Sequence, residues 1–401
     1  MASPLQHPER TSRAARRALL VWEQGGALGH HAALGTLARH LQARGVEVHA
    51  AVQRVSDAPE WFPAGVPLHA SPAPPRTPRG EPDVTYADVL SGLGWRHPRK
   101  LGKVVQQWRT LVDAVDPDVV VLNSAPTVHL ALHGGPRRIV GFGAPFFAQP
   151  PVRPLPPLEW WRPALPDGAA REQPVLDTAN ALRLPGSPAL VGLADLWSDT
   201  RWILHGPAEL DPWWDLRPPG TLHAGITAVL DRGGAPDWPA GDGPRVFAYL
   251  KPGFRYAPDV LAALERHGCR TVAFIPRDPD SRTPATPRTH VVREPLSIDA
   301  VRREADLVVT HSALTTGCAF LEAGVPGLFL PMHLEQLGSG RCASMRLKGA
   351  ATLPIGAVDT QLDRALRMIL HPAVRQATIA QMPRFERYRD PWARIADVVV
   401  G

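Results

Sequence analysis

The fold is predicted from the stretch RALLVWEQGGALGHHAALGTLARHLQARGVEVHAAV, residues Arg17–Val52. Short apolar runs at Arg17–Glu23 and Val46–Val52 have the length of buried strands. Between them, apolar side chains recur at the spacing of one helix face: Leu34, Leu37, Ala38 and Leu41. Three glycines and two histidines separate the first strand from this helix. A strand, turn, helix and parallel strand in this order predict a right-handed crossover unit.

The same alternation of strands and helices continues along the chain. A helix with apolar residues between Leu101 and Leu111 precedes a strand at Asp116–Asn123. In the second half, the expected strands lie at residues 245–250, 270–275, 306–311 and 325–331, and the expected helices at 257–268, 297–305 and 318–324. Pro-rich stretches at 59–82 and 145–166 are expected to be loops. The predicted fold class is therefore α/β, with two doubly wound, Rossmann-like domains.

Composition and charge narrow the class of protein. A length of 401 residues fits two ordinary domains, and 44% hydrophobic residues are typical of a globular chain. No apolar stretch reaches the roughly 18 residues of a membrane span, and residues 1–16 are expected to be a disordered tail rather than a signal peptide. The net charge of +6 is spread thinly, which does not favour nucleic-acid binding. Cys269, Cys318 and Cys342 lack a CxxC spacing, so free thiols and a cytoplasmic location are expected.

A second informative stretch is HSALTTGCAFLEAGVPGLFLPMHLEQ, residues His311–Gln336. It begins where an expected strand runs into a helix, so unpaired main-chain N–H groups there would attract an anion. Hydroxyls and an imidazole crowd this turn: His311, Ser312, Thr315 and Thr316. A pyrophosphate suits such a turn; the alternative is that these side chains only cap the helix. Glu335 and Gln336 end the loop after the next strand, where they would hold sugar hydroxyls.

This stretch resembles the C-terminal donor-binding signature of the two-domain GT-B glycosyltransferases, above all the antibiotic- and macrolide-modifying enzymes and, more distantly, the lipid II synthase MurG. The matching residues are His311, the pair Thr315–Thr316, the AGVP sequence at Ala323–Pro326, Pro331 and the pair Glu335–Gln336. Near the other end of the chain, the residues that resemble the family's N-terminal GxxGH turn are Gly26, Gly29 and His30. The sequence AELDPWW, Ala208–Trp214, lies where relatives carry a similar segment before the interdomain linker.

The resemblance implies two Rossmann-like domains that face each other across a cleft. Residues 17–216 are then the acceptor-binding domain, 217–244 a linker dense in Pro and Gly, and 245–385 the nucleotide-sugar-binding domain. Residues 386–401 are expected to form a C-terminal helix that crosses back to the first domain.

By the same resemblance, His30 is the general base that takes a proton from the acceptor, a task that suits an imidazole because it ionises near neutral pH. The alternatives are the adjacent His31 as the base and a mere helix-capping role for His30. Asn123 lies where many relatives have an aspartate behind the histidine, and an amide orients an imidazole without stabilising its charge. Glu23 would either orient His30 or pair with a surface arginine.

The resemblance also assigns residues on the donor side. Lys251 would supply a cation to the pyrophosphate, and Leu296 a main-chain contact to the nucleobase. Relatives that use UDP-sugars usually have a ribose-binding glutamate eight residues after His311, where this chain has Ala319. That difference favours a dTDP-sugar without excluding UDP. No group of Asp, His or Cys has metal-ligand spacing, so neither a metal nor another cofactor is expected.

The predicted activity is inverting transfer of a hexosyl or deoxyhexosyl group from a dTDP- or UDP-sugar to a small-molecule acceptor. Aromatic residues between Phe146 and Trp161 suggest an apolar acceptor cleft. Two alternatives stay open: a sugar-nucleotide 2-epimerase of the same fold, and a catalytically idle partner protein that binds sugar nucleotides. The acceptor, the sugar and the oligomeric state are not predicted.

Overall fold

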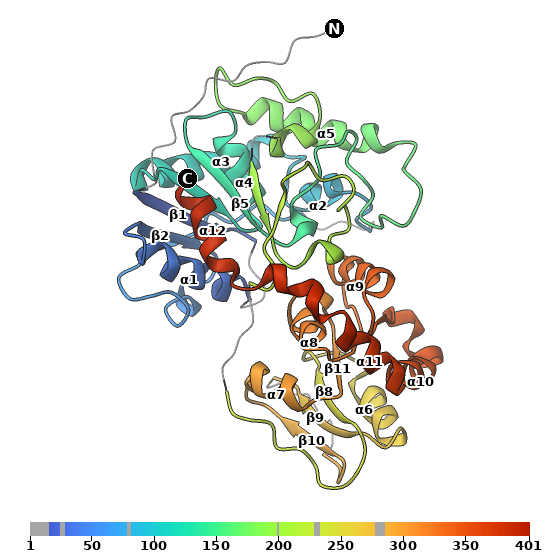
Figure 1. Ribbon diagram of the computed structural model, residues 1–401. Coiled ribbons are helices and arrows are strands. Elements are labelled where there is room, and N and C mark those ends of the chain that lie inside the picture. The colour runs from blue at the N-terminus through green and yellow to red at the C-terminus, as the bar shows by residue number, and fades with distance from the viewer. Residues whose placement is uncertain (1–15, 25–28, 78–81, 199, 228–232, 277–284) are drawn as a thin grey trace.

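The structure is a computed structural model of the chain, and it describes residues 16–24, 29–77, 82–198, 200–227, 233–276 and 285–401 (Figure 1). These residues form a seven-stranded sheet within residues 17–223 and a six-stranded sheet within residues 245–352. Neighbouring strands run parallel in both sheets. Because parallel strands need long crossovers, helices cover both faces of each sheet.

The first sheet has the strand order β3-β2-β1-β4-β5-β6-β7. Its strands are β1 (Arg17–Trp22), β2 (Glu47–Val52), β3 (Leu68–Ala70), β4 (Val119–Leu122), β5 (Arg138–Gly143), β6 (Arg201–Leu204) and β7 (Leu222–His223). The second sheet has the order β10-β9-β8-β11-β12-β13. Its strands are β8 (Arg245–Tyr249), β9 (Arg270–Phe274), β10 (Thr289–Val292), β11 (Leu307–Thr310), β12 (Gly327–Phe329) and β13 (Ala350–Thr352).

Helices connect the strands of each sheet. The first unit contains α1 (Gly29–Gln42), α2 (Tyr86–Gly92), α3 (Pro98–Val115), α4 (Pro126–Leu132) and α5 (Gly168–Leu182). The second contains α6 (Ala257–Arg266), α7 (Ile298–Glu304), α8 (Cys318–Glu322), α9 (Leu334–Arg346), α10 (Val358–Ile369) and α11 (Pro372–Ala380). None of the helices in the described ranges is long and apolar enough to cross a membrane.

Strand β1 shows how an apolar run becomes a central strand. Leu19 and Val21 pack in the hydrophobic cluster that α3, α4 and α5 cover. Leu20 and Trp22 pack in the cluster on the opposite face, together with α1. Successive side chains of a strand point to opposite faces, so a strand covered on both sides needs an uninterrupted apolar run.

The last helix, α12 (Pro391–Val400), lies beside α1 although the two are far apart in sequence (Figure 1). Ile395, Ala396 and Val399 belong to the same hydrophobic cluster as α1. Arg138 of β5 donates hydrogen bonds to the carbonyl oxygens of Val398 and Val399. The end of the chain is therefore built into the first sheet's outer layer.

The structure confirms the predicted fold class of two Rossmann-like units, and the strands and helices expected at Arg17–Val52 are present. The short strands β3, β5, β6, β7, β10 and β13 were not predicted, nor were the helices α2, α4, α5, α9, α10 and α11. Residues 217–244, expected to be a linker, include β7, which pairs with β6.

Candidate functional site

The carboxyl ends of the parallel strands bring several polar side chains to one edge of the first sheet. Glu23 follows β1, Asn123 follows β4 and His205 follows β6. Helix α1 starts at the same edge, with His30 as its second residue. Ligands of open α/β sheets bind at this edge, so these residues define the candidate site in the first unit.

His30 is held by two contacts from the sheet. Its ring stacks on Trp22, with ring centroids 4.8 Å apart and the planes 15° from parallel. Its Nδ1 atom lies 2.6 Å from Oδ1 of Asn123, whose side chain is fully buried. A carbonyl oxygen only accepts, so Nδ1 carries the proton and Nε2 keeps its lone pair. The pair Asn123–His30 therefore presents an imidazole in the form that a general base needs.

The charge state of His30 is set by its surroundings. Burial lowers the pKa of His30 from its usual value, and the hydrogen bond with Asn123 acts in the opposite direction. His205 is buried against Phe142, and burial together with the nearby His30 lowers the pKa of His205 to about 3. Both imidazoles are therefore neutral at neutral pH.

His31 has a different environment although it is adjacent in sequence. Its side chain is fully buried, packed edge-on against Trp22 and near the ring of Phe62. Neither of its ring nitrogens has a hydrogen-bond partner among the described residues. His31 is therefore a core side chain, and the geometry favours His30 over it as a base.

Glu23 does not contact His30 through a hydrogen bond. Its carboxylate accepts hydrogen bonds from the main-chain N–H groups of Thr127 (2.8 Å) and Val128 (3.2 Å), at the start of α4. These hydrogen bonds lower the pKa of Glu23, but burial outweighs them and raises the pKa to about 7. The side chain thus caps α4, which differs from both roles that the sequence suggested for it.

Next to Asn123, the first unit contains a partly enclosed pocket with aromatic walls. Its lining residues are Tyr86, Leu122, Ser124, Ala125, Pro126, His129, Phe147, Trp197 and Trp202. Of the aromatic residues between Phe146 and Trp161, which were expected to form an acceptor cleft, only Phe147 lines this pocket. The other aromatic residues were missed, as was His205, which directly follows the apolar run of β6 at the sheet edge.

On the second sheet, His311 follows β11 and joins the ends of three strands. Its Nδ1 donates to the carbonyl oxygen of Leu330 (2.7 Å), and its Nε2 accepts from the main-chain N–H of Lys251 (2.9 Å). Burial lowers the pKa of His311 to about 4. Both ring nitrogens are bonded to main-chain groups, so His311 has no ring N–H left to donate to a phosphate, which differs from the prediction. Its ring fixes the Lys251 turn instead.

The residues after His311 form a tight helical turn. Ser312 Oγ accepts from the N–H of Leu314 (3.2 Å), which is a capping contact. Residues Ala313–Gly317, which include the half-buried Thr315 and Thr316, form a π-helical turn. A Cβ atom on Gly317 would lie 2.4 Å from Phe329 and 2.6 Å from the Ser312 carbonyl, so only glycine fits.

The remaining predicted donor residues surround this turn or lie near it. Burial raises the pKa of Glu335 to about 7, and the nearby Lys251 acts against that shift. Gln336 accepts from the N–H of Met332 through its Oε1 (2.8 Å). Leu296 forms a bridge with Gly234.

The glycines of the N-terminal turn can be placed only in part. Gly29 is the first residue of α1 and has open space where a Cβ would be. Gly26 lies outside the described residues.

The two units meet beside these sites. Gly206, directly after His205, has φ +81°, and a Cβ there would lie 2.5 Å from the side chain of Leu314. The turn after β11 therefore reaches the edge of the first sheet that carries His205 and, two strands away, Asn123 with His30.

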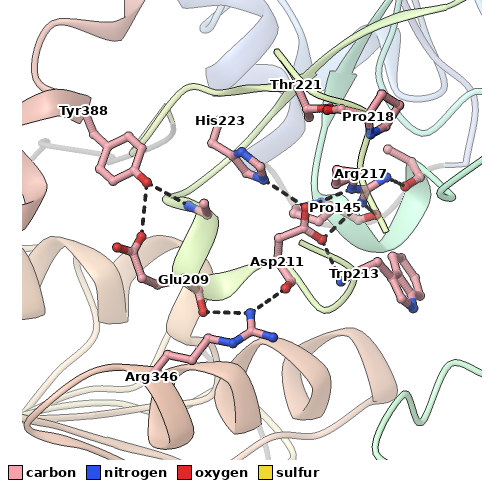
Figure 2. A network of polar contacts seen from close by, with 12 residues as sticks. Pro145, Glu209, Asp211, Trp213, Arg217, Pro218, Thr221, His223, Arg346 and Tyr388 are labelled. Atoms are coloured by element: carbon pink, nitrogen blue, oxygen red, sulfur yellow. Dashed lines mark hydrogen bonds and ion pairs between the residues drawn. The ribbon is translucent and has the colours of Figure 1, made fainter. Parts of the chain in front are cut away.

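A buried polar network also joins the units (Figure 2). Asp211 is fully buried and binds Arg217 (2.9 Å) and His223 (2.9 Å). Burial alone would raise the pKa of Asp211, but these partners outweigh it and hold the pKa at about 2. Arg346 of α9 donates to the Asp211 carbonyl oxygen (2.8 Å), so the second unit holds the same segment.

Within the described ranges, no group of three or more His, Cys, Asp or Glu side chains is arranged to hold a metal ion. The three cysteines are free and buried.

No protein-family model matches the chain, and no curated protein matches it. Solved structures match it over almost its whole length. The glycosyltransferase of kitacinnamycin has a TM-score of 0.67 at 20% identity, covering 96% of this chain and 98% of its own. CalG4, the calicheamicin glycosyltransferase, has a TM-score of 0.69 at 17% identity, and the match covers 96% of this chain and 97% of CalG4. The spinosyn rhamnosyltransferase SpnG, solved with thymidine diphosphate, has a TM-score of 0.61 at 18% identity, and the match covers 95% of this chain and 99% of SpnG. The chain therefore has the GT-B fold of these glycosyltransferases.

Proposed function

We propose that this protein is an inverting glycosyltransferase that moves a sugar from a nucleoside-diphosphate donor to a small natural-product acceptor. The observation that carries the proposal is His30. A neutral imidazole with its Nδ1 hydrogen-bonded to Asn123 stands at the edge of the first sheet. The fold shared with natural-product glycosyltransferases supports the same reading.

In the proposed reaction, Nε2 of His30 takes the proton of the acceptor hydroxyl. The acceptor oxygen bonds to the anomeric carbon while the bond from that carbon to the diphosphate oxygen breaks, and its electron pair leaves with the diphosphate. Lys251 and the hydroxyls of Thr315 and Thr316 would stabilise the departing charge. His311 contributes by holding the main chain at Lys251 in place.

Thymidine diphosphate is the nucleotide that we propose for the donor. Ala319, at the position expected to reach the ribose, is fully buried beside Phe320 and Val325 in an apolar cluster. A 2′-hydroxyl would therefore find no carboxylate from that position. The match to a rhamnosyltransferase solved with thymidine diphosphate agrees with this choice. Glu335 and Gln336 would hold the sugar.

Product analysis with a radiolabelled sugar nucleotide tests the proposal against its two rivals. A transferase yields nucleoside diphosphate together with a glycosylated acceptor. An epimerase would convert the donor into a second sugar nucleotide without using the acceptor. A donor that is bound but recovered unchanged with every acceptor would identify an idle binding protein.

A further inference from the structure

The loop between β5 and α5 leaves the first sheet at the edge where the candidate base stands. It follows the carboxyl end of β5, and β5 is paired with β4, the strand that Asn123 follows. Leu158 anchors the loop, because its side chain is buried in the first unit and its N–H donates to the carbonyl oxygen of Val84 (2.8 Å). Trp160 and Trp161 follow closely in the sequence, so an anchored segment carries both indole rings.

Both rings contact α9 of the second unit. The guanidinium carbon of Arg341 lies 4.3 Å from the ring centre of Trp161. The guanidinium carbon of Arg346 lies 5.6 Å from the ring centre of Trp160 and 5.3 Å from that of Trp214. Such cation–π contacts are strongest on tryptophan and where water is excluded. The Nε atom of Arg341 is buried without a hydrogen-bond partner among the described residues, and the face of Trp161 is the contact that meets its charge.

The same helix begins with the residues proposed to hold the sugar. Leu334 is the first residue of α9, and Glu335 and Gln336 follow it directly. Leu334 packs against the hydrophobic cluster of the first unit to which Leu158 belongs. The start of α9 therefore docks on the cluster that anchors the loop, and the second half of α9 docks on the two tryptophans of the loop.

The position of α9 matters because hydrogen bonds to a sugar act over a short range. Glu335 and Arg341 belong to one continuous helix, and their separation along its axis is about 9 Å. A contact that holds the helix at Arg341 therefore also bears on the place of the Glu335 carboxylate. A hydrogen bond between a hydroxyl and a carboxylate weakens beyond about 3 Å, and a misplacement of about 1 Å can cost about a hundredfold in rate.

We propose that Arg341, through its stack on Trp161, is a positioning residue for the sugar of the donor: it holds α9 so that Glu335 reaches the sugar hydroxyls. The first unit in this way sets the affinity for the sugar, whereas the turns at Lys251 and Thr315 bind the diphosphate without the help of the stack. This inference rests on the proposed donor binding.

Calorimetry with and without the sugar tests the inference. Binding of dTDP measures the contacts of the nucleoside and the diphosphate, and binding of dTDP-glucose or dTDP-rhamnose adds those of a sugar. For the sugar nucleotide that the wild type binds more tightly, Arg341→Ala should raise the ratio of its Kd to the Kd of dTDP about tenfold. The Kd of dTDP itself should change less than twofold.

Two further variants show whether Arg341 acts through the ring and through Glu335. Trp161→Leu removes the ring face and should raise the ratio as Arg341→Ala does, whereas Trp161→Phe keeps a ring face and should recover most of the wild-type ratio. Glu335→Ala should raise the ratio at least tenfold. Adding Arg341→Ala to Glu335→Ala should raise it no further, because residues that act through one contact are not additive.

Arg364→Ala is the matched control, because Arg364 is an exposed arginine on α10 of the same unit. It should leave both dissociation constants unchanged. An unchanged ratio in Arg341→Ala, an equal loss of affinity for dTDP and for the sugar nucleotide, or a further rise in the double variant would overturn the inference while leaving donor binding in place. A wild-type protein that binds neither dTDP nor a sugar nucleotide would instead overturn the proposed function.

Discussion

At the scale of single residues, two adjacent histidines have different surroundings because successive residues of a helix point about 100° apart. His30 faces the sheet edge and Asn123, whereas His31 is buried against Trp22 and Phe62. The sequence predicted the pair between the first strand and the first helix, and the structure places both residues in the first turn of α1. It did not separate them on physical grounds, since the phase of α1 relative to the sheet depends on packing far from the turn.

Replacing His30 tests its role as the base. His30→Ala should lower kcat by about a hundredfold or more, the usual contribution of a positioned base. Donor affinity should stay close to the wild-type value, because the residue belongs to the other sheet. Steady-state kinetics and calorimetry with dTDP measure the two quantities. A variant with weakened dTDP binding and unchanged kcat would place His30 on the donor side.

The companion change, His31→Leu, should have little effect on activity. It removes a buried ring whose nitrogens have no partner among the described residues, so the free energy of unfolding should stay equal or rise slightly. Urea denaturation measures the free energy of unfolding, and the same steady-state assay measures the activity. Loss of activity as large as that of His30→Ala would show that His31, and not its neighbour, is the base.

At the scale of elements, the turn after β11 was predicted from its residue types but not in its detail. The sequence placed His311, Ser312 and the threonines correctly in a turn between a strand and a helix. It could not show that Ser312 caps the turn or that both nitrogens of His311 bind main-chain groups. The two His311 contacts come from segments 19 and 60 residues away, which no local pattern records.

Replacing His311 should therefore affect stability and nucleotide binding together. His311→Ala leaves two buried main-chain groups unpaired, each costing about 1–3 kcal/mol of unfolding free energy. It also releases the turn that carries Lys251. Lys251→Met should weaken dTDP binding without a comparable loss of stability. Calorimetry and urea denaturation of both variants test this. A stable His311→Ala protein that no longer binds dTDP would instead make His311 a direct ligand of the phosphates.

At the scale of the whole molecule, the segment Ala208–Trp214 joins the two units. Figure 2 shows Asp211 between Arg217 and His223, with Arg346 reaching the same segment from α9 and Tyr388 bonded to Glu209. The sequence suggested a junction here by resemblance alone. Its polar contacts link residues from distant parts of the chain and could not be predicted from periodicity.

Removing the buried carboxylate tests how much this junction stabilises the fold. Asp211→Ala leaves Arg217 and His223 without their partner and should lower the free energy of unfolding by about 3–5 kcal/mol at pH 7. Asp397→Ala, which breaks the exposed pair with Arg44, should cost less than about 1 kcal/mol.

The effect of Asp211 should also depend on pH in a defined direction. Its pKa is lower in the folded protein, about 2, than in the unfolded chain, about 3.9. The stabilisation is therefore complete above pH 4 to 5 and is lost as the pH falls towards 2. The difference between wild type and Asp211→Ala should shrink over that window in urea denaturation. A difference that stays constant from pH 7 to pH 2.5 would mean that the charge of Asp211 is not what stabilises the junction.

The anomeric configuration of the product tests the central claim, direct displacement assisted by His30, most directly. A dTDP-α-sugar is incubated with 4-(2-hydroxyethyl)phenol, and the glycoside is analysed by proton NMR alongside the release of dTDP. We predict a β-glycoside formed in step with dTDP by the wild-type protein, and a rate about a hundredfold or more lower for His30→Ala. An α-glycoside, or a β-glycoside formed at the wild-type rate by His30→Ala, would contradict the account.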